Sequence, residues 1–170
     1  MYADYKGTRK PMAEELRQQV PVIKEVLQAM NIEIIEKEGL EADDLLGTIS
    51  RMCEEKGMDV SIISGDRDTL QLATEHVKIR IPKTKQGRTE VEDYNAAEVE
   101  EHYGVTPKEF IDVKALMGDA SDNIPGVPGI GEKTATKIIQ QYKSIENAYE
   151  HADELKPPRA SKNLKEYWEQ

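Results

Sequence analysis

GDASDNIPGVPGIG, residues 118–131, is the stretch of sequence around which the rest of the chain can be interpreted. Two carboxylates, Asp119 and Asp122, stand directly before a loop of glycine and proline. Because they are three residues apart, a helical or compact turn would aim both at one point, as a divalent cation with oxygen ligands requires. The stretch therefore predicts a metal-binding acid pair beside a loop.

The glycines of this loop predict a phosphate site. Gly126, Gly129 and Gly131 let the backbone approach a ligand closely and adopt positive φ angles. Backbone N–H groups at the end of such a loop and at the start of the next helix, which carries Lys133 and Lys137, bind phosphate without reading base sequence. We therefore predict contact with a nucleic-acid backbone. The alternative is that the stretch is only a helix cap followed by a tight turn.

The composition indicates one or two soluble domains. The chain has 170 residues, of which 38% are hydrophobic, and no apolar run approaches the roughly 20 residues that a membrane helix needs. With one Trp and one Phe, aromatic stacking on bases is not expected to dominate nucleic-acid contacts. The single cysteine, Cys53, is expected to be a buried thiol beside Ile49 and Met52. No secretory signal is visible, so we expect a cytoplasmic protein.

The charge is unevenly distributed. A formal net charge of −10 argues against a general polyanion binder, but the basic residues are clustered. Lys6, Arg9 and Lys10 make the first ten residues net basic, and residues 78–88 hold a second basic run. These two runs could flank an acidic centre, or they could simply be solvated surface.

Hydrophobic periodicity predicts an α/β chain followed by helices. An amphipathic helix over 12–30 is expected to kink or break at Pro21, and strands are expected at 32–36 and 60–64. The other expected elements are helices at 41–56, 96–103, 107–117, 132–142 and 144–152, a short helix through residues 70–72, and a hairpin of 77–81 with 89–91. Alternating strands and helices favour a mostly parallel sheet, whose sites lie at the carboxyl ends of its strands.

Acidic side chains gather at three places along this pattern. They are Glu41, Asp43 and Asp44 at a helix start, Asp66 and Asp68 after a strand, and Asp119 and Asp122 before the loop. If they converge, their mutual repulsion requires cations, and a carboxylate-only set favours Mg²⁺ or Mn²⁺. Two such ions about 4 Å apart suit hydrolysis of a phosphodiester bond. Lys6 or Arg9 could steady the scissile phosphate.

Four motifs together resemble the 5′ nuclease domain of bacterial DNA polymerase I. They are YKGTRKPM at 5–12, GLEADD at 39–44, SGDRD at 64–68 and FIDVKALMGDASDNIPGVPGIGEKTA at 110–135. The resemblance implies a Rossmann-like, PIN-like sheet, two metal sites formed by the seven acids, and active-site roles for Lys6 and Arg9 in a helical arch. It also implies a helix-three-turn-helix element over 113–142, which binds the DNA backbone and often holds K⁺. The implied DNA-binding residues are Gly126, Val127, Gly129, Ile130, Gly131, Lys133, Thr134 and Lys137.

The resemblance gives a domain division and an alternative function. We expect a nuclease core at 1–94 with part of the arch at 1–12, a DNA-binding subdomain at 95–156, and a polar tail at 157–170. The implied activity is 5′-3′ exonuclease and flap endonuclease cleavage of DNA in replication and repair. Family members carry two earlier strands with metal ligands, and this chain starts after both. It is therefore expected to be a fragment, and the alternative is a non-catalytic structure-specific DNA-binding protein. An attached polymerase domain and a second copy covering exposed apolar surface stay open. The first ten residues are expected to be disordered without DNA.

Overall fold

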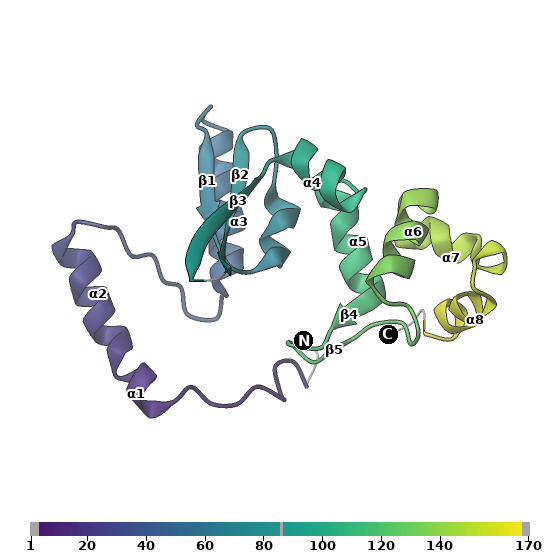
Figure 1. The fold of residues 1–170 in the computed structure, drawn as a ribbon, viewed down its shortest axis with the longest axis horizontal. Helices are drawn as coiled ribbons and strands as arrows, with labels where there is room; N and C mark the ends of the chain where they lie inside the picture. The colour runs from purple at the N-terminus through teal and green to yellow at the C-terminus, as the bar shows by residue number, and fades with distance from the viewer. Residues whose placement is uncertain (1–3, 86, 168–170) are drawn as a thin grey trace.

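The computed structural model describes residues 4–85 and 87–167. An N-terminal arm carries helices α1 (Glu14–Arg17) and α2 (Gln19–Ala29), and it extends away from the rest of the molecule (Figure 1). The break between them falls just before Pro21. Because proline lacks an N–H, it is tolerated in the first turn of α2 but could not continue a helix from Arg17. The kink or break predicted at Pro21 is thus a break, and it lies three residues earlier, at Gln18.

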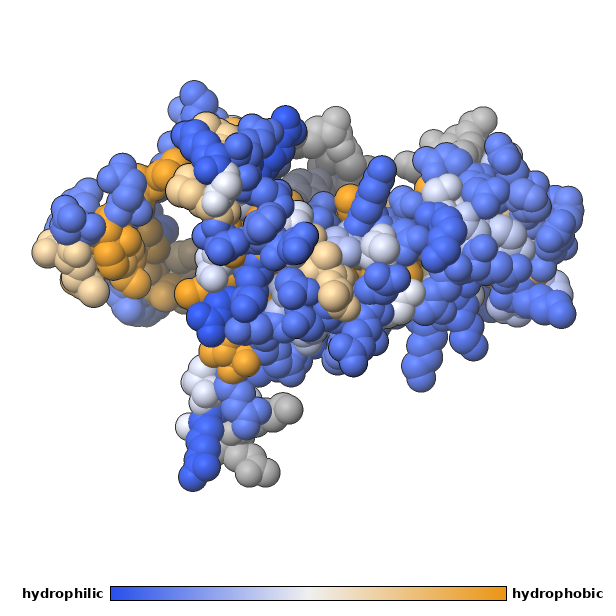
Figure 2. Space-filling model, turned by 90° about the horizontal axis from the view of Figure 1, so that it is seen from above, coloured by the Kyte–Doolittle hydropathy of each residue, from blue (hydrophilic) through white to orange (hydrophobic). Residues whose placement is uncertain are grey.

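The apolar stripe of the arm is not buried against the body of the protein. Leu16 is 53% exposed and Ile23 is 59% exposed, and α2 has no buried residue. Figure 2 shows these apolar side chains on the surface at the end of the molecule where the arm lies. The strand expected at 32–36 is wrong, since these residues are irregular. A strand forms only where a neighbour pairs with its backbone, and no described strand lies beside this segment.

A three-stranded sheet forms the centre of the N-terminal half. Its strands are β1 (Val60–Ile63), β2 (Val77–Lys85) and β3 (Arg88–Tyr94), in the order β1-β2-β3. β1 and β2 pair in parallel, and the segment that connects them contains the 3₁₀ helix η1 (Arg67–Leu72). β2 and β3 form the expected antiparallel hairpin. The structure is therefore α/β, and this three-stranded sheet contains one parallel and one antiparallel strand pair.

Helix α3 (Ala42–Glu54) packs against β1 and matches the predicted helix closely. Gly57, with φ +73°, stops it as expected and donates its N–H to the Glu54 carbonyl at 2.8 Å. The apolar face differs from the expectation in one place. Cys53 is half-buried, but Met52 is 51% exposed, so the two side chains do not share a buried face.

The C-terminal half is helical, with a two-stranded β-corner at its centre. Its helices are α4 (Ala96–Tyr103), α5 (Pro107–Met117), α6 (Glu132–Tyr142), α7 (Ile145–Glu150) and α8 (Pro158–Glu166), with the 3₁₀ helix η2 (Ala152–Glu154). The corner consists of β4 (Gly118–Asp119) and β5 (Ile124–Pro125). Thr106 caps α5 and Pro107 occupies its first position, both as predicted.

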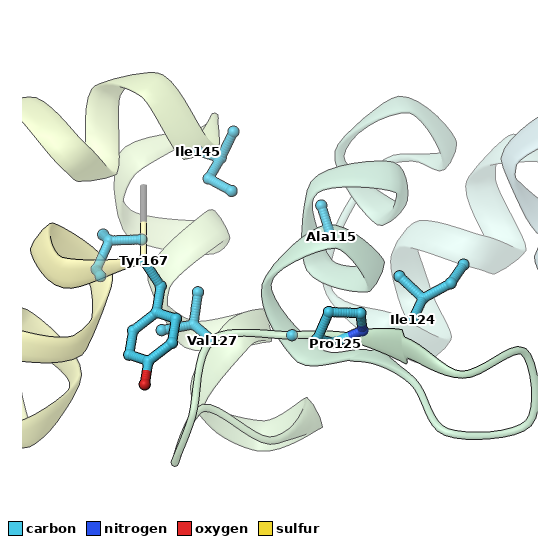
Figure 3. A pocket seen from close by; sticks show the side chains of 8 residues that line it. Ala115, Ile124, Pro125, Val127, Ile145 and Tyr167 are labelled. Carbon is cyan, nitrogen blue, oxygen red and sulfur yellow. The ribbon is translucent and has the colours of Figure 1, made fainter. Parts of the chain in front are cut away.

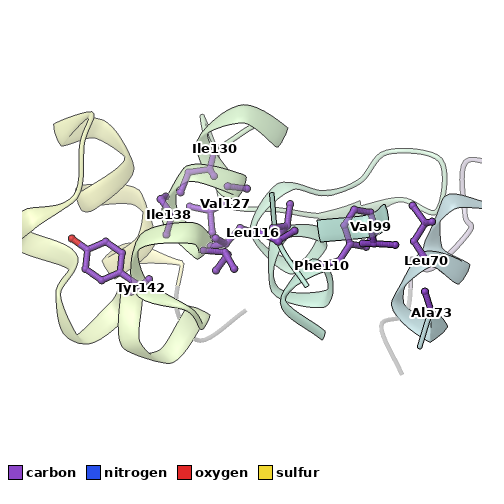
Figure 4. Close-up of a cluster of buried hydrophobic side chains, with 14 of the residues drawn as sticks. Leu70, Ala73, Val99, Phe110, Leu116, Val127, Ile130, Ile138 and Tyr142 are labelled. Atoms are coloured by element: carbon purple, nitrogen blue, oxygen red, sulfur yellow. The ribbon is translucent and has the colours of Figure 1, made fainter. Parts of the chain in front are cut away.

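Helix α8 occupies most of the segment that the sequence suggested was a polar tail. It buries Ala160 and Leu164 and is otherwise polar. One continuous hydrophobic core runs from Leu70 and Ala73 beside the sheet, through Phe110 and Leu116, to the last helices (Figure 4). No helix within residues 4–85 and 87–167 is long and apolar enough to cross a membrane.

Candidate active site and nucleic-acid interface

The seven predicted acids come from three places in the fold. Glu41, Asp43 and Asp44 lie at the start of α3, and Asp66 and Asp68 follow β1. Asp119 and Asp122 lie at the β4–β5 corner. Two of these acids also have local structural roles. Asp44 Oδ2 accepts the Glu41 N–H at 2.9 Å and closes a capping box, and Asp66 Oδ1 accepts the Asp68 N–H at 3.0 Å.

Asp119 is the most strongly bound of the seven acids. Its Oδ1 accepts the Ser121 N–H at 2.8 Å, the Ser121 hydroxyl at 2.6 Å and the Asp122 N–H at 3.2 Å. Its Oδ2 accepts the Lys114 ammonium at 2.9 Å. The hydrogen bonds from Ser121, followed by those from Lys114, hold the pKa of Asp119 well below its usual value. Asp119 is therefore ionised at neutral pH.

Lys114 also joins the two halves of the acid site. Its Nζ lies 2.9 Å from Asp68 Oδ1 as well as 2.9 Å from Asp119 Oδ2. Burial lowers the pKa of Lys114, but its hydrogen bonds to the two carboxylates outweigh burial and raise the pKa overall. The ammonium is therefore a fixed positive charge between the acid after β1 and the acid at the β4–β5 corner.

The N-terminal segment binds two further acids, Glu41 and Asp122, contrary to the expectation of disorder. Lys6 Nζ lies 2.6 Å from Glu41 Oε2, and Arg9 pairs with Asp122. The Tyr5 hydroxyl is within hydrogen-bond distance of both carboxylates, at 3.1 Å from Glu41 and 3.3 Å from Asp122. The expectation overlooked these polar contacts because it considered only apolar anchors. The expectation of disorder also covered residues 1–3, which lie outside the described part of the chain.

The negative charges converge on Asp43. Burial raises its pKa first, and the nearby charges of Asp66, Asp68 and Glu41 raise it further. A cavity of about 350 Å³ between α3 and η1 is lined by Asp43, Asp44 and Asp68. Carboxylate oxygens are the donors that Mg²⁺ and Mn²⁺ prefer, so the chemistry of this set fits a hard divalent ion.

The described residues do not, however, form a ready metal cage. Among residues 4–85 and 87–167, no three His, Cys, Asp or Glu side chains lie close enough to hold one ion. Lys6, Arg9 and Lys114 instead pair with four of the acids, Glu41, Asp122, Asp68 and Asp119.

The glycine loop is held by close backbone contact. A Cβ on Gly126 would lie 2.2 Å from the Met117 carbonyl carbon and 2.4 Å from the Gly118 nitrogen, so only glycine fits there. Val127 donates its N–H to the Leu116 carbonyl at 2.8 Å, and the Val127 and Ile130 side chains are buried. Ile130 donates its N–H to the Val127 carbonyl at 3.0 Å, so both N–H groups are bonded within the protein and any contact of these residues with a ligand would come from their backbone carbonyls.

The remaining loop positions are open to a ligand. Gly129 has φ +81°, whereas Gly131 is the N-cap of α6 with φ −95°, so of the three loop glycines only Gly129 needs the left-handed region. A Cβ on Gly131 would meet nothing within 4 Å. On the helix that follows, Lys133 and Lys137 are exposed and Thr134 is partly exposed.

Helix α8 closes the other side of the loop. Asn163 donates its side-chain N–H to the Pro128 carbonyl at 2.5 Å, and Arg159 lies beside Gly129. A largely apolar cavity of about 370 Å³ lies beside the loop, and in Figure 3 Val127 stands next to Tyr167, with Pro125 across from them.

Sequence reasoning missed several of these contacts. Lys114 stands five residues before Asp119, so its contact with that acid could have been noticed from their spacing, whereas Tyr5 lies far along the chain from both of its partners. No sequence signal pointed to α8 as a neighbour of the loop.

Comparisons with known proteins agree with this geometry. Residues 1–104 match the family described as 5′-3′ exonuclease, N-terminal resolvase-like domain, and residues 105–170 match 5′-3′ exonuclease, C-terminal SAM fold. DNA polymerase I of Bacillus caldotenax is 46% identical over 168 residues, which are 99% of this chain and 19% of that protein. The chain thus spans about a fifth of the length of the curated relatives that it matches.

Solved structures give the same result. The 5′-exonuclease of T5 with bound zinc superimposes with a TM-score of 0.74 at 27% identity, covering 96% of this chain and 62% of the other. The bacteriophage T5 flap endonuclease in complex with DNA and metal ions has a TM-score of 0.74 at 26% identity, with the same coverage. Because its two halves match the two domains of one family along its whole length, the chain belongs to the 5′-3′ exonuclease family.

Proposed function

We propose that the chain is a metal-dependent 5′-3′ exonuclease and structure-specific flap endonuclease, which hydrolyses phosphodiester bonds of DNA in replication and repair. One observation carries the proposal. Carboxylates from the start of α3, the end of β1 and the β4–β5 corner are linked through Tyr5, Lys6 and Lys114, directly beside the glycine loop. An acid site next to a backbone-presenting loop suits cleavage of a bound polynucleotide.

The residues that would hold the metal are the seven acids. These are Glu41, Asp43, Asp44, Asp66, Asp68, Asp119 and Asp122. Two bound Mg²⁺ or Mn²⁺ ions would lower the pKa of the attacking water and stabilise negative charge on the phosphate. Ser121 keeps Asp119 ionised, and the crowding of charge around Asp43 favours a cation there.

Lys6 and Arg9 are proposed to bind the scissile phosphate. Both carry positive charge in the free protein, where they are paired with Glu41 and Asp122. The hydrogen bond to Glu41 raises the pKa of Lys6, which therefore stays protonated. A phosphate bound beside the acids would replace the two carboxylates as the partner of Lys6 and Arg9, and the two cations would stay in the same place.

The loop is proposed to hold duplex DNA through its backbone. Gly129, Gly131 and the first turn of α6 would supply N–H donors, and Lys133 and Lys137 would add charge. K⁺ is the ion expected at this loop. In this assignment residues 1–94 form the nuclease core and residues 95–156 the DNA-binding part, which acts on chromosomal DNA in the cytoplasm.

A second candidate function is DNA binding without catalysis. It is favoured by the cations that neutralise the acids, since no described trio of acids is arranged around a metal position. In that case the loop would recognise branched or nicked duplex, and the acid site would only stabilise the fold.

A flap-cleavage assay tests both functions. The chain is incubated with a 5′-flap duplex and Mg²⁺ or Mn²⁺, alongside Asp119→Ala and the control Asp59→Asn, whose carboxylate is 89% exposed and away from the motifs. Under the nuclease proposal, the unchanged chain and the control cleave the flap and Asp119→Ala does not. Equal cleavage by Asp119→Ala refutes the assigned site. Salt-dependent duplex binding without any cleavage favours the second function.

A further inference from the structure

Arg159 of helix α8 lies against the loop that is proposed to hold DNA. A Cβ built on Gly129 would sit 3.3 Å from Arg159 Nε and 3.7 Å from its Cζ, so the guanidinium occupies the space that a side chain at Gly129 would fill. The missing side chain of Gly129 thus lets a cation approach the loop backbone closely.

The position of Arg159 is fixed by the packing of its helix. Ala160 and Leu164 of α8 are each 1% exposed, and Asn163 donates to the Pro128 carbonyl, one residue before Gly129. Arg159 and Asn163 are four residues apart and so lie on the same side of α8, which places Arg159 beside the loop with its side chain exposed.

The charge of Arg159 is available. In the described part of the chain, the Arg159 side chain makes no ion pair or hydrogen bond, although acidic residues outnumber basic ones in the sequence by 33 to 23. Lys165, on the same helix, is by contrast paired with Asp153 at 2.5 Å. An unpaired guanidinium next to the loop that leads into the N-terminus of α6 has the composition of an anion site.

We propose that Arg159 contacts a phosphate of duplex DNA adjacent to the one held by the loop, so that α8 forms a second side of the DNA-binding site. This inference rests on the proposed function and extends it to a helix outside the element over 113–142. The ligand is the phosphodiester backbone, which a guanidinium can bind with two parallel hydrogen bonds and without regard to base sequence.

The proposal predicts that removing Arg159 weakens DNA binding more than removing a positive charge elsewhere on the surface. One phosphate contact contributes about one counterion to the salt dependence of binding, so its removal reduces the slope of log affinity against log salt by about one. A lysine at the same position keeps the charge but loses the planar fork, and so retains part of the effect.

Three variants test it on the whole chain by fluorescence anisotropy with a labelled 5′-flap duplex over a range of salt concentrations. Arg159→Met keeps the aliphatic stem and removes the charge, Arg159→Lys keeps the charge, and Lys165→Met is the matched control from the same helix. We expect Arg159→Met to bind about three- to tenfold more weakly with a smaller salt slope, Arg159→Lys to recover most of the affinity, and Lys165→Met to resemble the unchanged chain.

The outcomes separate this inference from the proposed function. If the unchanged chain binds the duplex and Arg159→Met matches Lys165→Met in affinity and slope, Arg159 makes no phosphate contact while the loop proposal stands. If the unchanged chain shows no salt-dependent binding, the DNA-binding function itself is wrong. Equal melting curves for the variants by circular dichroism exclude misfolding as the cause of weaker binding.

Discussion

The Asp119 carboxylate is bound by the ammonium of Lys114, five residues earlier in the chain, with 2.9 Å between Nζ and Oδ2. Lys114 stands on α5 and Asp119 on β4, and the same ammonium reaches Asp68 in η1. One cation therefore joins the sheet half of the molecule to the helical half. It does so at the acids that we assign to metal binding.

Replacing Lys114 by Met should destabilise the metal-free protein and make it more dependent on metal. The side chain is 26% exposed, so the loss lies between the values for surface and buried pairs, at about 1–2 kcal/mol. Saturating Mn²⁺ should reduce this loss, because a bound cation can neutralise Asp68 and Asp119 instead. Urea unfolding with and without Mn²⁺ measures both effects.

The exposed Lys108 on the same helix supplies the control for this experiment. Lys108→Met should change stability by less than about 0.5 kcal/mol in either condition. A Lys114→Met loss that is the same with and without Mn²⁺ would show that no metal takes over the role of the ammonium.

Local signals predicted the helices of the C-terminal half well. The bounds expected for the helices at 107–117 and 132–142 agree with α5 and α6. The signals that mark these helix starts, Thr106 with Pro107 and the glycines around residue 131, lie next to the helices in the sequence. The strand expected at 32–36 failed because a strand depends on a partner, which hydrophobic pattern alone does not supply. Helix α8 was missed because it is stabilised by packing against other elements of the chain, where it buries Leu164, and its own sequence is otherwise polar.

In the candidate site, too, the local features were predictable from the sequence and the long-range contacts were not. The acids and the loop glycines could be selected from their order and spacing, since each group sits at the end of an element. Their partners could not. Tyr5 reaches Glu41 across 36 residues and Asp122 across 117, and no sequence spacing encodes such a contact.

Gly126→Ala should be among the most destabilising single substitutions in the chain. The added Cβ would lie 2.2 Å from the Met117 carbonyl carbon, and backbone atoms cannot move aside as a side chain can. We expect a loss of more than about 2 kcal/mol, within the range for overpacking. The control is Gly65→Ala, where a Cβ meets nothing within 4 Å and φ is not positive. Equal melting temperatures for the two variants would contradict the close contact.

Glu109→Gln should lose stability that depends on pH. Burial raises the pKa of Glu109, but the Thr106 N–H, at 2.8 Å from Oε2, and the nearby Lys143 outweigh it and lower the pKa overall. A lowered pKa in the folded state means that the stabilisation is present above the unfolded pKa, about 4.3, and is lost as pH falls through the folded pKa.

The expected difference from the unchanged chain is about 1 kcal/mol at pH 7, typical of a capping interaction, and it should shrink below pH 4. Guanidinium unfolding at several pH values measures it, with the exposed Glu101→Gln of α4 as the control. A difference that stays constant with pH would mean that the carboxylate charge contributes nothing to the cap.

Chelation of divalent ions should separate cleavage from binding. The loop is proposed to hold DNA with backbone N–H groups, which need no divalent ion, whereas hydrolysis needs metal at the acids. With EDTA, flap cleavage should cease while duplex affinity changes less than about threefold, a difference under 1 kcal/mol. Added Mg²⁺ should restore cleavage. Loss of duplex binding together with cleavage would show that the metal, and not the loop, holds the DNA.

Two glycines of the loop, Gly129 and Gly131, allow backbone strain to be separated from phosphate approach. Gly129, at φ +81°, is in the left-handed region that a β-branched residue avoids, and a side chain there would also displace Arg159. Gly129→Val should therefore lose stability, by about 1–2 kcal/mol, as well as duplex affinity. Gly131 has neither constraint, because its φ is −95° and a Cβ there meets no protein atom.

Gly131→Val is thus the more informative variant. As the N-cap of α6, it should lose only about 0.5–1 kcal/mol of stability, yet its side chain would stand where a phosphate must approach the first N–H groups of that helix. We expect duplex affinity to fall roughly tenfold or more, equivalent to about 1.4 kcal/mol. The loss should be the same for any base sequence, and both the variant and the unchanged chain should bind more weakly at high salt. Anisotropy with two duplexes of unrelated sequence, at low and high salt, measures this. Unchanged affinity in Gly131→Val, with the fold intact by circular dichroism, would mean that the loop is only a turn between α5 and α6.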